Sequence, residues 1–360
     1  MVHILLSAIV IIAFIGRDKD RTITRIAFFL LYLFAGLRYM FGNDYPSYFR
    51  AYERIKNGNL AVFEGEILYT ILNLASPTFY ILIAVTSLVF VYTIYHLITR
   101  NLPKPYVWVG LLIFVIDPYL FLMNLSAMRQ CLAMVLFIMA VHFAANRKPL
   151  PYMLLLVAAT LFHKSAVILL PFYFFLDARP VKIGKISIIF AVVFLGLYVV
   201  DLSAVAVVVA KWFGDSQYLH HASGGGRNSL RATLLTAVYF VFVLMNLPKL
   251  KGRMLVFAKA YLVGTMLGVL AFRLSLTTRI QMYFDIFAVV AIPAILAELW
   301  KEGMVRVDLK HPVTSFLACM NHYALPTLVF AIFFLRYYSF FANPRWEPFT
   351  GYRTIFDLIG

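Results

Sequence analysis

Charged side chains are scarce in this chain, and acidic ones are the scarcest. Only 13% of the 360 residues are charged, and 16 Asp and Glu stand against 32 Lys and Arg. Hydrophobic residues make up 63% of the chain, well above the share of an ordinary globular domain. This scarcity of charge argues against a soluble domain, and the composition predicts that lipid is the solvent for most of the fold.

Cysteine and metal-ligand clusters are scarce as well. The two cysteines, Cys131 and Cys319, each fall within an apolar run, so no disulfide framework is expected. No His, Asp and Glu cluster occurs at ligand spacing, so neither a metal nor another cofactor is expected. The net charge of +16 comes from Lys and Arg scattered among short polar gaps, so membrane topology explains it and no nucleic-acid partner is expected.

Long apolar runs are what the sequence has in abundance. A helix needs roughly 20 mainly apolar residues to cross about 30 Å of hydrocarbon. The first run, Val2–Ile15, is followed at once by basic residues and is interpreted as a retained span, not a cleaved signal peptide. The predicted fold is a single, all-α, polytopic membrane domain of residues 1–360 with about 12 transmembrane helices. The expected spans are residues 2–16, 23–41, 78–99, 106–123, 128–145, 151–162, 166–177, 186–201, 231–247, 254–272, 280–300 and 313–335.

The polar gaps between the runs alternate between two sets. One set is short and basic, and the positive-inside preference places it in the cytoplasm. The other set faces outward and contains the loops 42–77 and 202–230 and the C-terminal tail 336–360. Within the first of these loops, Ile67–Ala75 is apolar but too short to cross, so a short helix is expected that lies at the outer interface or dips partway into the membrane.

An interruption at His163 and Lys164 divides the apolar block 151–177. About 12 residues remain on each side, and at 1.5 Å per residue each arm reaches roughly 18 Å, short of the hydrocarbon thickness. We interpret the block as a re-entrant hairpin whose apex lines a cavity below the outer surface. The alternative is one long tilted helix, which would place the later basic loops outside, against the charge preference.

Four polar stretches are expected to meet at the outer membrane boundary, and they contain an excess of Arg over Lys. Ionisable groups at membrane depth are costly and are functional candidates by default, and guanidinium suits phosphates and carboxylates. The alternatives are arginines that snorkel at helix ends and aromatics of the interfacial belt. The candidate residues are Arg38, Asp44, Tyr45, Tyr48, Arg129, Gln130, His163, Lys164, Arg273, Arg279 and Tyr283.

The order and spacing of four motifs carry a resemblance to a known family. They are the segment Gly42-x-Asp44-Tyr45-x-x-Tyr48, the pair Arg129-Gln130, the segment Phe162-His163-Lys164-Ser165-Ala166, and Arg279 followed by Tyr283-Phe284. In these features, and over nearly its full length, the chain resembles the EpsG branch of the Wzy-type polysaccharide polymerases.

The resemblance implies a glycosyltransferase of the bacterial inner membrane with its active site facing the periplasm. It would move a growing chain from an undecaprenyl-diphosphate carrier onto the non-reducing end of a new lipid-linked repeat unit. The donor and acceptor would both be undecaprenyl-diphosphate-linked glycans surrounded by membrane lipid. A chain-length regulator stays open as a further partner.

The expected roles follow from the chemistry of this transfer. Arginines would stabilise the charge that grows on the diphosphate leaving group, and no metal would be needed. The acceptor hydroxyl needs a base, for which Asp44 is preferred, with His163 as substrate orienter. The expected catalytic residues are Asp44, His163, Arg129 and Arg279, and the expected substrate-binding residues are Arg38, Tyr45, Tyr48, Gln130, Lys164, Arg273 and Tyr283.

Three other functions remain open at this point. A polyprenyl-phosphate-sugar-dependent glycosyltransferase would also use an acidic residue of an early outer loop, but would add one sugar. A lipid-linked oligosaccharide flippase or other transporter should hold its charges near the midplane and show two related halves, which this sequence does not. An acyltransferase acting on glycans would use His163 as base.

Overall fold

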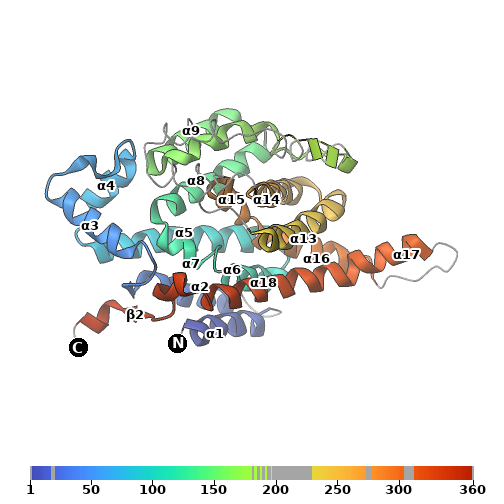
Figure 1. The fold of residues 1–360 in the computed structure, drawn as a ribbon, viewed down its shortest axis with the longest axis horizontal. Helices are drawn as coiled ribbons and strands as arrows, with labels where there is room; N and C mark the ends of the chain where they lie inside the picture. Colours follow the sequence, from blue (N-terminus) through green and yellow to red (C-terminus); the bar gives the residue numbers. More distant parts are fainter. Residues whose placement is uncertain are drawn as a thin grey trace. The chain divides into compact units, whose positions relative to one another are not determined.

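The chain is almost entirely helical. The computed structural model describes residues 2–17, 21–180, 229–272, 277–303 and 312–358, together with a few positions between 182 and 196. About 82% of it is helical, which confirms the predicted all-α, membrane-like fold (Figure 1).

The helices long and apolar enough to cross a membrane number five in the described ranges, or six if one bent pair counts as a single span. The bent pair, Thr277–Asp285 and Ala288–Lys301, turns by 53°. Shorter apolar helices of 10–17 residues lie at five more of the expected spans, and the expected span 186–201 falls largely outside the described residues. The full count of twelve therefore stays a prediction. The five long helices are Phe79–Asn101, Met128–Ala145, Leu230–Lys249, Gly252–Leu270 and Val313–Phe341.

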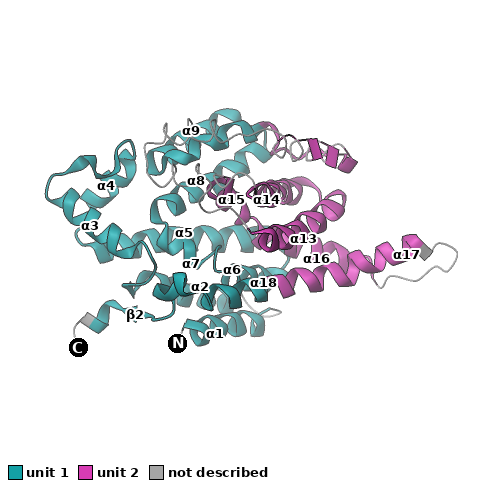
Figure 2. Ribbon diagram, in the orientation of Figure 1, with its two compact units in different colours: residues 1–173, 333–360 teal, residues 174–332 magenta. Residues whose placement is uncertain are grey.

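The chain divides into two compact units (Figure 2). Unit 1 comprises residues 1–173 and 333–360, and unit 2 comprises residues 174–332. Each unit is described by itself below.

The body of unit 1 is a series of neighbouring helices. The helix α1 packs against α2 and α6, and α2 packs against α5 (Figure 1). The helix α8 packs against both α5 and α9. Local signals set the ends of α5: the Thr78 hydroxyl accepts a hydrogen bond from the Ile81 N–H, and the helix stops before Pro103. The elements are α1 (Val2–Ile15), α2 (Arg21–Gly36), α5 (Phe79–Asn101), η2 (Lys104–Tyr106), α6 (Val107–Ile116), α7 (Leu122–Ser126), α8 (Met128–Ala145) and α9 (Pro149–Phe162).

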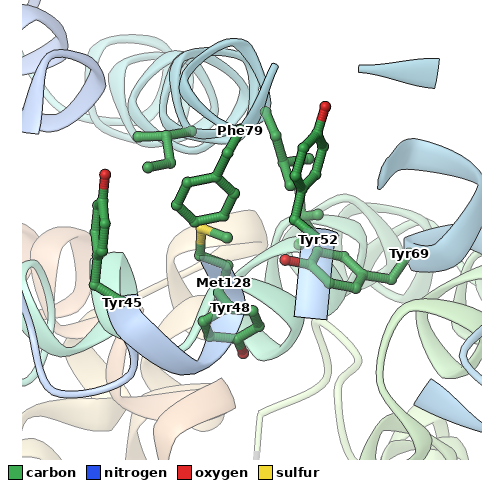
Figure 3. Close-up of a cluster of buried hydrophobic side chains, with 9 residues drawn as sticks. Tyr45, Tyr48, Tyr52, Tyr69, Phe79 and Met128 are labelled. Atoms are coloured by element: carbon green, nitrogen blue, oxygen red, sulfur yellow. The ribbon is translucent and has the colours of Figure 1, made fainter. Parts of the chain in front are cut away.

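The outer loop between α2 and α5 is itself structured. It contains β1 (Arg38–Tyr39), α3 (Tyr45–Lys56), the 3₁₀ helix η1 (Leu60–Phe63) and α4 (Ile67–Ala75). The helix α4 matches the short helix expected there. One face of α3 presents Tyr45, Tyr48 and Tyr52, which pack with Tyr69, Phe79 and Met128 in a buried cluster (Figure 3). This aromatic cluster fixes the outer loop to the starts of α5 and α8.

The block 151–177 does turn back on itself. The helix α9 ends at His163, whose backbone is extended, and the 3₁₀ helix η3 (Lys164–Phe174) follows. The Tyr152 hydroxyl donates to the Leu169 carbonyl at 2.7 Å, and the Tyr152 and Tyr173 rings lie 5.2 Å apart. The start of one arm thus contacts the far half of the other, so the two arms are antiparallel and the single straight helix is excluded.

The C-terminal segment returns to the outer loop of unit 1. Its elements are α18 (Leu325–Phe341), η6 (Pro344–Phe349), β2 (Arg353–Thr354) and η7 (Ile355–Leu358). The strands β1 and β2 pair antiparallel, and the Gly42 N–H donates to the Pro348 carbonyl at 3.1 Å. The sequence offered no sign of this pairing, because two-residue strands leave no periodicity to detect.

In unit 2, α14 is the central helix and packs against α13, α15 and α16. Two glycines of α14 permit this: a Cβ at Gly264 would lie 2.7 Å from Asp285 Oδ1, and one at Gly268 would lie 2.7 Å from Gln281 Nε2. The elements are α13 (Leu230–Asn246), η4 (Leu247–Lys249), α14 (Gly252–Leu270), α15 (Thr277–Asp285), α16 (Ala288–Lys301), α17 (Pro312–Cys319) and the π-helix η5 (Met320–Ala324).

Candidate active site

The centre of the candidate site is the carboxylate of Glu66, a residue that is only 3% exposed. Its Oε2 accepts a hydrogen bond from Arg129 Nη1 at 2.5 Å. Its Oε1 lies 2.8 Å from His163 Nδ1 and accepts from the Lys164 backbone N–H at 3.3 Å. One carboxylate thereby joins the outer loop, the start of α8 and the apex of the hairpin.

The fold places each of these groups at the end of a helix. Glu66 immediately precedes α4, Arg129 is the second residue of α8, and His163 immediately follows α9. Residues at helix ends can turn their side chains toward a shared point while the helices themselves stay packed. The aromatic cluster and the hairpin hold the three ends together, so the site depends on tertiary structure rather than on one local motif.

The guanidinium of Arg129 is held on several sides. It lies 4.3 Å from the centre of the Phe63 ring and 5.8 Å from that of Tyr48, and its Nε donates to the Tyr48 hydroxyl at 3.4 Å. Cation–π contacts of this kind favour a cation over an aromatic face. The Arg129 side chain is still 24% exposed, against 4% for Glu66, so part of its donor surface is accessible to an anionic ligand.

Lys164 places a second cation beside Gly65, the residue before Glu66. Its side chain lies against Gly65, where φ is +79°, and a Cβ at that glycine would lie 2.8 Å from Lys164 Cε. A side chain at position 65 would be strained by the positive φ and would make the flexible end of the Lys164 side chain shift.

Opposing effects set the ionisation of the buried acid. Burial raises the pKa of Glu66, but the hydrogen bond with His163 and the charges of Arg129 and His163 outweigh it and leave the pKa below the ordinary 4.5. Burial raises the pKa of the Tyr48 phenol, an effect that the neighbouring Arg129 reduces. At neutral pH the site therefore holds an ionised carboxylate beside a neutral phenol.

The model of the EpsG family matches residues 21–339 of the chain. The chain belongs to the EpsG family. No curated protein and no solved structure matches it. Membership agrees with the resemblance to the EpsG-type branch of the Wzy polymerases, and indicates a polysaccharide polymerase-like function of the general glycosyltransferase type.

Four of the predicted site residues come together in this EpsG-family protein: Tyr48, Arg129, His163 and Lys164. Glu66, the residue that connects three of them, was missed by the sequence analysis. The available signal was indirect. The outward cations need a counter-charge, and Glu66 is one of few acidic residues in the outer loop and directly precedes an apolar stretch.

Arg38, a predicted substrate-binding residue, is buried between helices of unit 1. It is 2% exposed, and its guanidinium donates to the Ser87 hydroxyl at 2.7 Å, to the Leu125 carbonyl at 2.9 Å and to the Ala35 carbonyl. These bonds connect α2, α5 and α7, which favours a structural role over the predicted contact with substrate.

The remaining predicted residues of unit 1 differ in their exposure. Asp44 is exposed, and its N–H donates to the Ser126 hydroxyl at 3.0 Å. Tyr45 is buried against Phe79 in the aromatic cluster, and Gln130 is buried in α8. Their predicted contacts with substrate stay predictions.

Two of the predicted site residues lie in the described ranges of unit 2. Arg279 and Tyr283 lie in α15, where Tyr283 is buried and Arg279 is partly exposed. Arg273 lies outside the described residues. In the part of the chain that the structure describes, no three His, Cys, Asp or Glu side chains lie close enough to hold a metal ion.

Proposed function

We propose that this EpsG-family protein joins undecaprenyl-diphosphate-linked oligosaccharide repeat units at the periplasmic face of the bacterial inner membrane, without a metal. The observation that carries the proposal is the cluster of Arg129, Glu66 and His163. It unites a partly exposed cation, a candidate proton acceptor and aromatic faces in the segment that the charge pattern places outside.

The cluster contains the chemical groups that glycosyl transfer from a diphosphate carrier requires. Negative charge grows on the diphosphate as the anomeric C–O bond breaks, and preorganised cations stabilise that charge more than they stabilise the bound ground state. Arg129 and Lys164 supply such cations in unit 1. The catalytic role of Arg279, in unit 2, stays a prediction. The rings of Phe63 and Tyr48 beside Arg129 suit contact with a sugar face.

Membrane lipid is the other proposed partner, because the polyprenyl tails of both substrates lie in the bilayer. Five or six spanning helices in the described ranges agree with a multi-pass protein. The proposed topology has about twelve spans, with the basic gaps in the cytoplasm and residues 42–77, the hairpin apex and residues 336–360 on the periplasmic side.

The first experiment measures the length distribution of the surface or secreted glycan, by gel, in a host with the gene deleted and then restored. We expect single repeat units after deletion and the full ladder after restoration. Loss of even the single unit would contradict polymerisation and favour transport or an earlier glycosyl transfer.

The second experiment tests the site by variants. Arg129→Ala and Arg279→Ala should each remove the ladder at unchanged protein level. The matched control is Arg50→Ala, because Arg50 is an exposed arginine of the same outer loop whose Nη2 donates to the Ser47 hydroxyl at 3.4 Å. A wild-type ladder in Arg129→Ala would exclude the proposed role of this cluster.

A further inference from the structure

A pocket of unit 1 lies where four of its helices end or begin. It is formed by the end of α1, the first turn of α2, the last turns of α5 and the segment that leads into α6. The space within it is about 430 Å³, part of which is open solvent, so the enclosed part suits one small polar group rather than a large ligand. Its polar and glycine lining residues are Gly16, Arg17, Thr24, Tyr95, Thr99 and Lys104.

Helix packing fixes the walls of this pocket. A Cβ at Gly16 would lie 2.7 Å from Ile23 Cβ, so the glycine permits α2 to begin close against the end of α1. The Tyr95 ring packs edge-on against Phe28 of α2, with the ring centres 5.2 Å apart. The Thr99 hydroxyl donates to the Tyr95 carbonyl at 2.7 Å. The pocket is therefore built on packed helices rather than on a single loop.

The chemistry of the lining is one-sided. It includes two cations and three hydroxyl groups, and none of the lining residues is acidic. Within the part of the chain that the structure describes, Lys104 forms no ion pair, and the hydroxyls of Thr24 and Tyr95 form no hydrogen bond. The Arg17 guanidinium lies 4.1 Å from the centre of the Phe14 ring. Such a lining offers donors to an anion and no carboxylate to repel it.

The pocket lies at the opposite end of α5 from the candidate active site. Phe79, the first residue of α5, packs in the aromatic cluster beside that site, whereas Tyr95 and Thr99 lie in the last two turns of the helix. The rise from Phe79 to Thr99 is about 30 Å, which equals the usual thickness of the hydrocarbon. The positive-inside preference places the gaps with Arg17 and Lys104 in the cytoplasm, where phospholipid head groups border the helix ends.

We propose that this pocket binds a phosphate group at the cytoplasmic surface of the membrane. Guanidinium, ammonium and hydroxyl groups all donate to phosphate oxygens, and basic pockets between transmembrane helices on this side suit anionic lipid head groups. The phosphate of an anionic phospholipid and free inorganic phosphate share this chemistry. The pocket lies apart from the Glu66 cluster, so binding there does not depend on the proposed function.

The test is the thermal unfolding midpoint of the full chain in detergent, because a ligand that binds only the folded chain raises that midpoint. One arm adds phosphatidylglycerol and compares it with phosphatidylcholine, whose head group carries an additional positive charge. The other arm adds inorganic phosphate and compares it with chloride at equal ionic strength. A rise with phosphatidylglycerol alone identifies a lipid head group, and a rise with inorganic phosphate identifies the free anion.

Variants test whether the pocket itself binds the probe. Lys104→Met should weaken the affinity by about tenfold or more, and Tyr95→Phe, which removes only a hydroxyl, by about fivefold. The matched control is Lys148→Met, because Lys104 and Lys148 are both exposed and each directly precedes a proline in a gap that is expected in the cytoplasm. This control should keep the affinity of the wild type.

Two outcomes would overturn the phosphate site. One is a wild-type midpoint that neither probe raises above its comparison compound; a carboxylate of Asp18 or Asp20, which follow Arg17 and lie outside the described residues, would produce this result by filling the pocket. The other is equal affinity in Lys104→Met and Lys148→Met, which would mean attraction by surface charge alone. If Lys104→Met does not fold, wild-type affinity in Tyr95→Phe decides against the site.

Discussion

The side chain of Lys164 passes directly over Gly65, so close that a methyl group on that glycine would lie 2.8 Å from Lys164 Cε. This contact links the outer loop to the hairpin apex independently of the Glu66 carboxylate. It also makes the position of one predicted substrate-binding cation depend on the absence of a side chain elsewhere.

Gly65→Ala therefore tests Lys164 without changing the lysine. The added methyl group should displace the lysine and shorten the glycan ladder, and the left-handed backbone should add a strain of about 1–3 kcal/mol. The matched control is Gly58→Ala. Its φ is also positive, +91° against +79° at Gly65, but among the described residues nothing lies within 4 Å of a Cβ added there. The midpoint of thermal unfolding should shift by a similar amount in both variants. If the two variants give glycan ladders of equal length, Lys164 is not needed in its present place.

The depressed pKa of Glu66 predicts a pH-dependent stability. Because the folded pKa lies below the ordinary 4.5, the stabilisation is fully present above about pH 4.5 and is lost as the pH falls through the folded value. The unfolding midpoints of wild type and Glu66→Gln should therefore differ at neutral pH and converge under acid conditions. The control is Glu64→Gln, because Glu64 is exposed, and its unfolding midpoint should follow that of the wild type at every pH. If the difference between wild type and Glu66→Gln does not shrink as the pH falls, the ion pairing of Glu66 is contradicted.

The sequence predicts the helical elements of this protein better than it predicts the site. Apolar length and basic gaps are properties of single segments, so most helices of the described ranges and the break at His163 could be located from them. Glu66 could not, because its importance arises from the meeting of three segments, and a lone acid before a short helix looks like an ordinary interfacial residue. The burial of Arg38 could not be predicted either, because its hydrogen bonds depend on the packing of α2, α5 and α7.

The C-terminal segment should hold the turn that carries Asp44. The Tyr352 ring stacks on Phe34 at 4.4 Å, and its hydroxyl donates to the Phe34 carbonyl at 2.8 Å. Tyr352→Phe keeps the stacking and should cost about 0.5–1.5 kcal/mol, whereas Tyr352→Ala loses the ring and should cost about 3–5 kcal/mol. Unfolding in detergent measures both stability costs, and only Tyr352→Ala should shorten the glycan ladder. If the two variants lose the same stability and give the same ladder, the ring does not anchor the segment.

Lys259 of unit 2 is buried in α14, with only 1% of it exposed. Its ammonium donates to the Asp177 carbonyl at 2.8 Å and to Asp177 Oδ1 at 2.9 Å, while the Asp177 side chain itself is 21% exposed. Removing one partner of a buried pair leaves the other charge uncompensated, and the cost depends on how much water that charge can reach.

The two partners should therefore respond unequally to substitution. Asp177→Ala leaves a fully buried ammonium and should destabilise the protein by about 3–5 kcal/mol, whereas Lys259→Met leaves a carboxylate that water can reach and should cost less. Lys249→Met is the control, because Lys249 pairs with the half-exposed Glu302 and such pairs contribute about 0–1 kcal/mol. Unfolding in detergent compares the stability of the three variants. A larger loss of stability in Lys259→Met than in Asp177→Ala would mean that Lys259 stabilises α14 by its packing rather than by its charge.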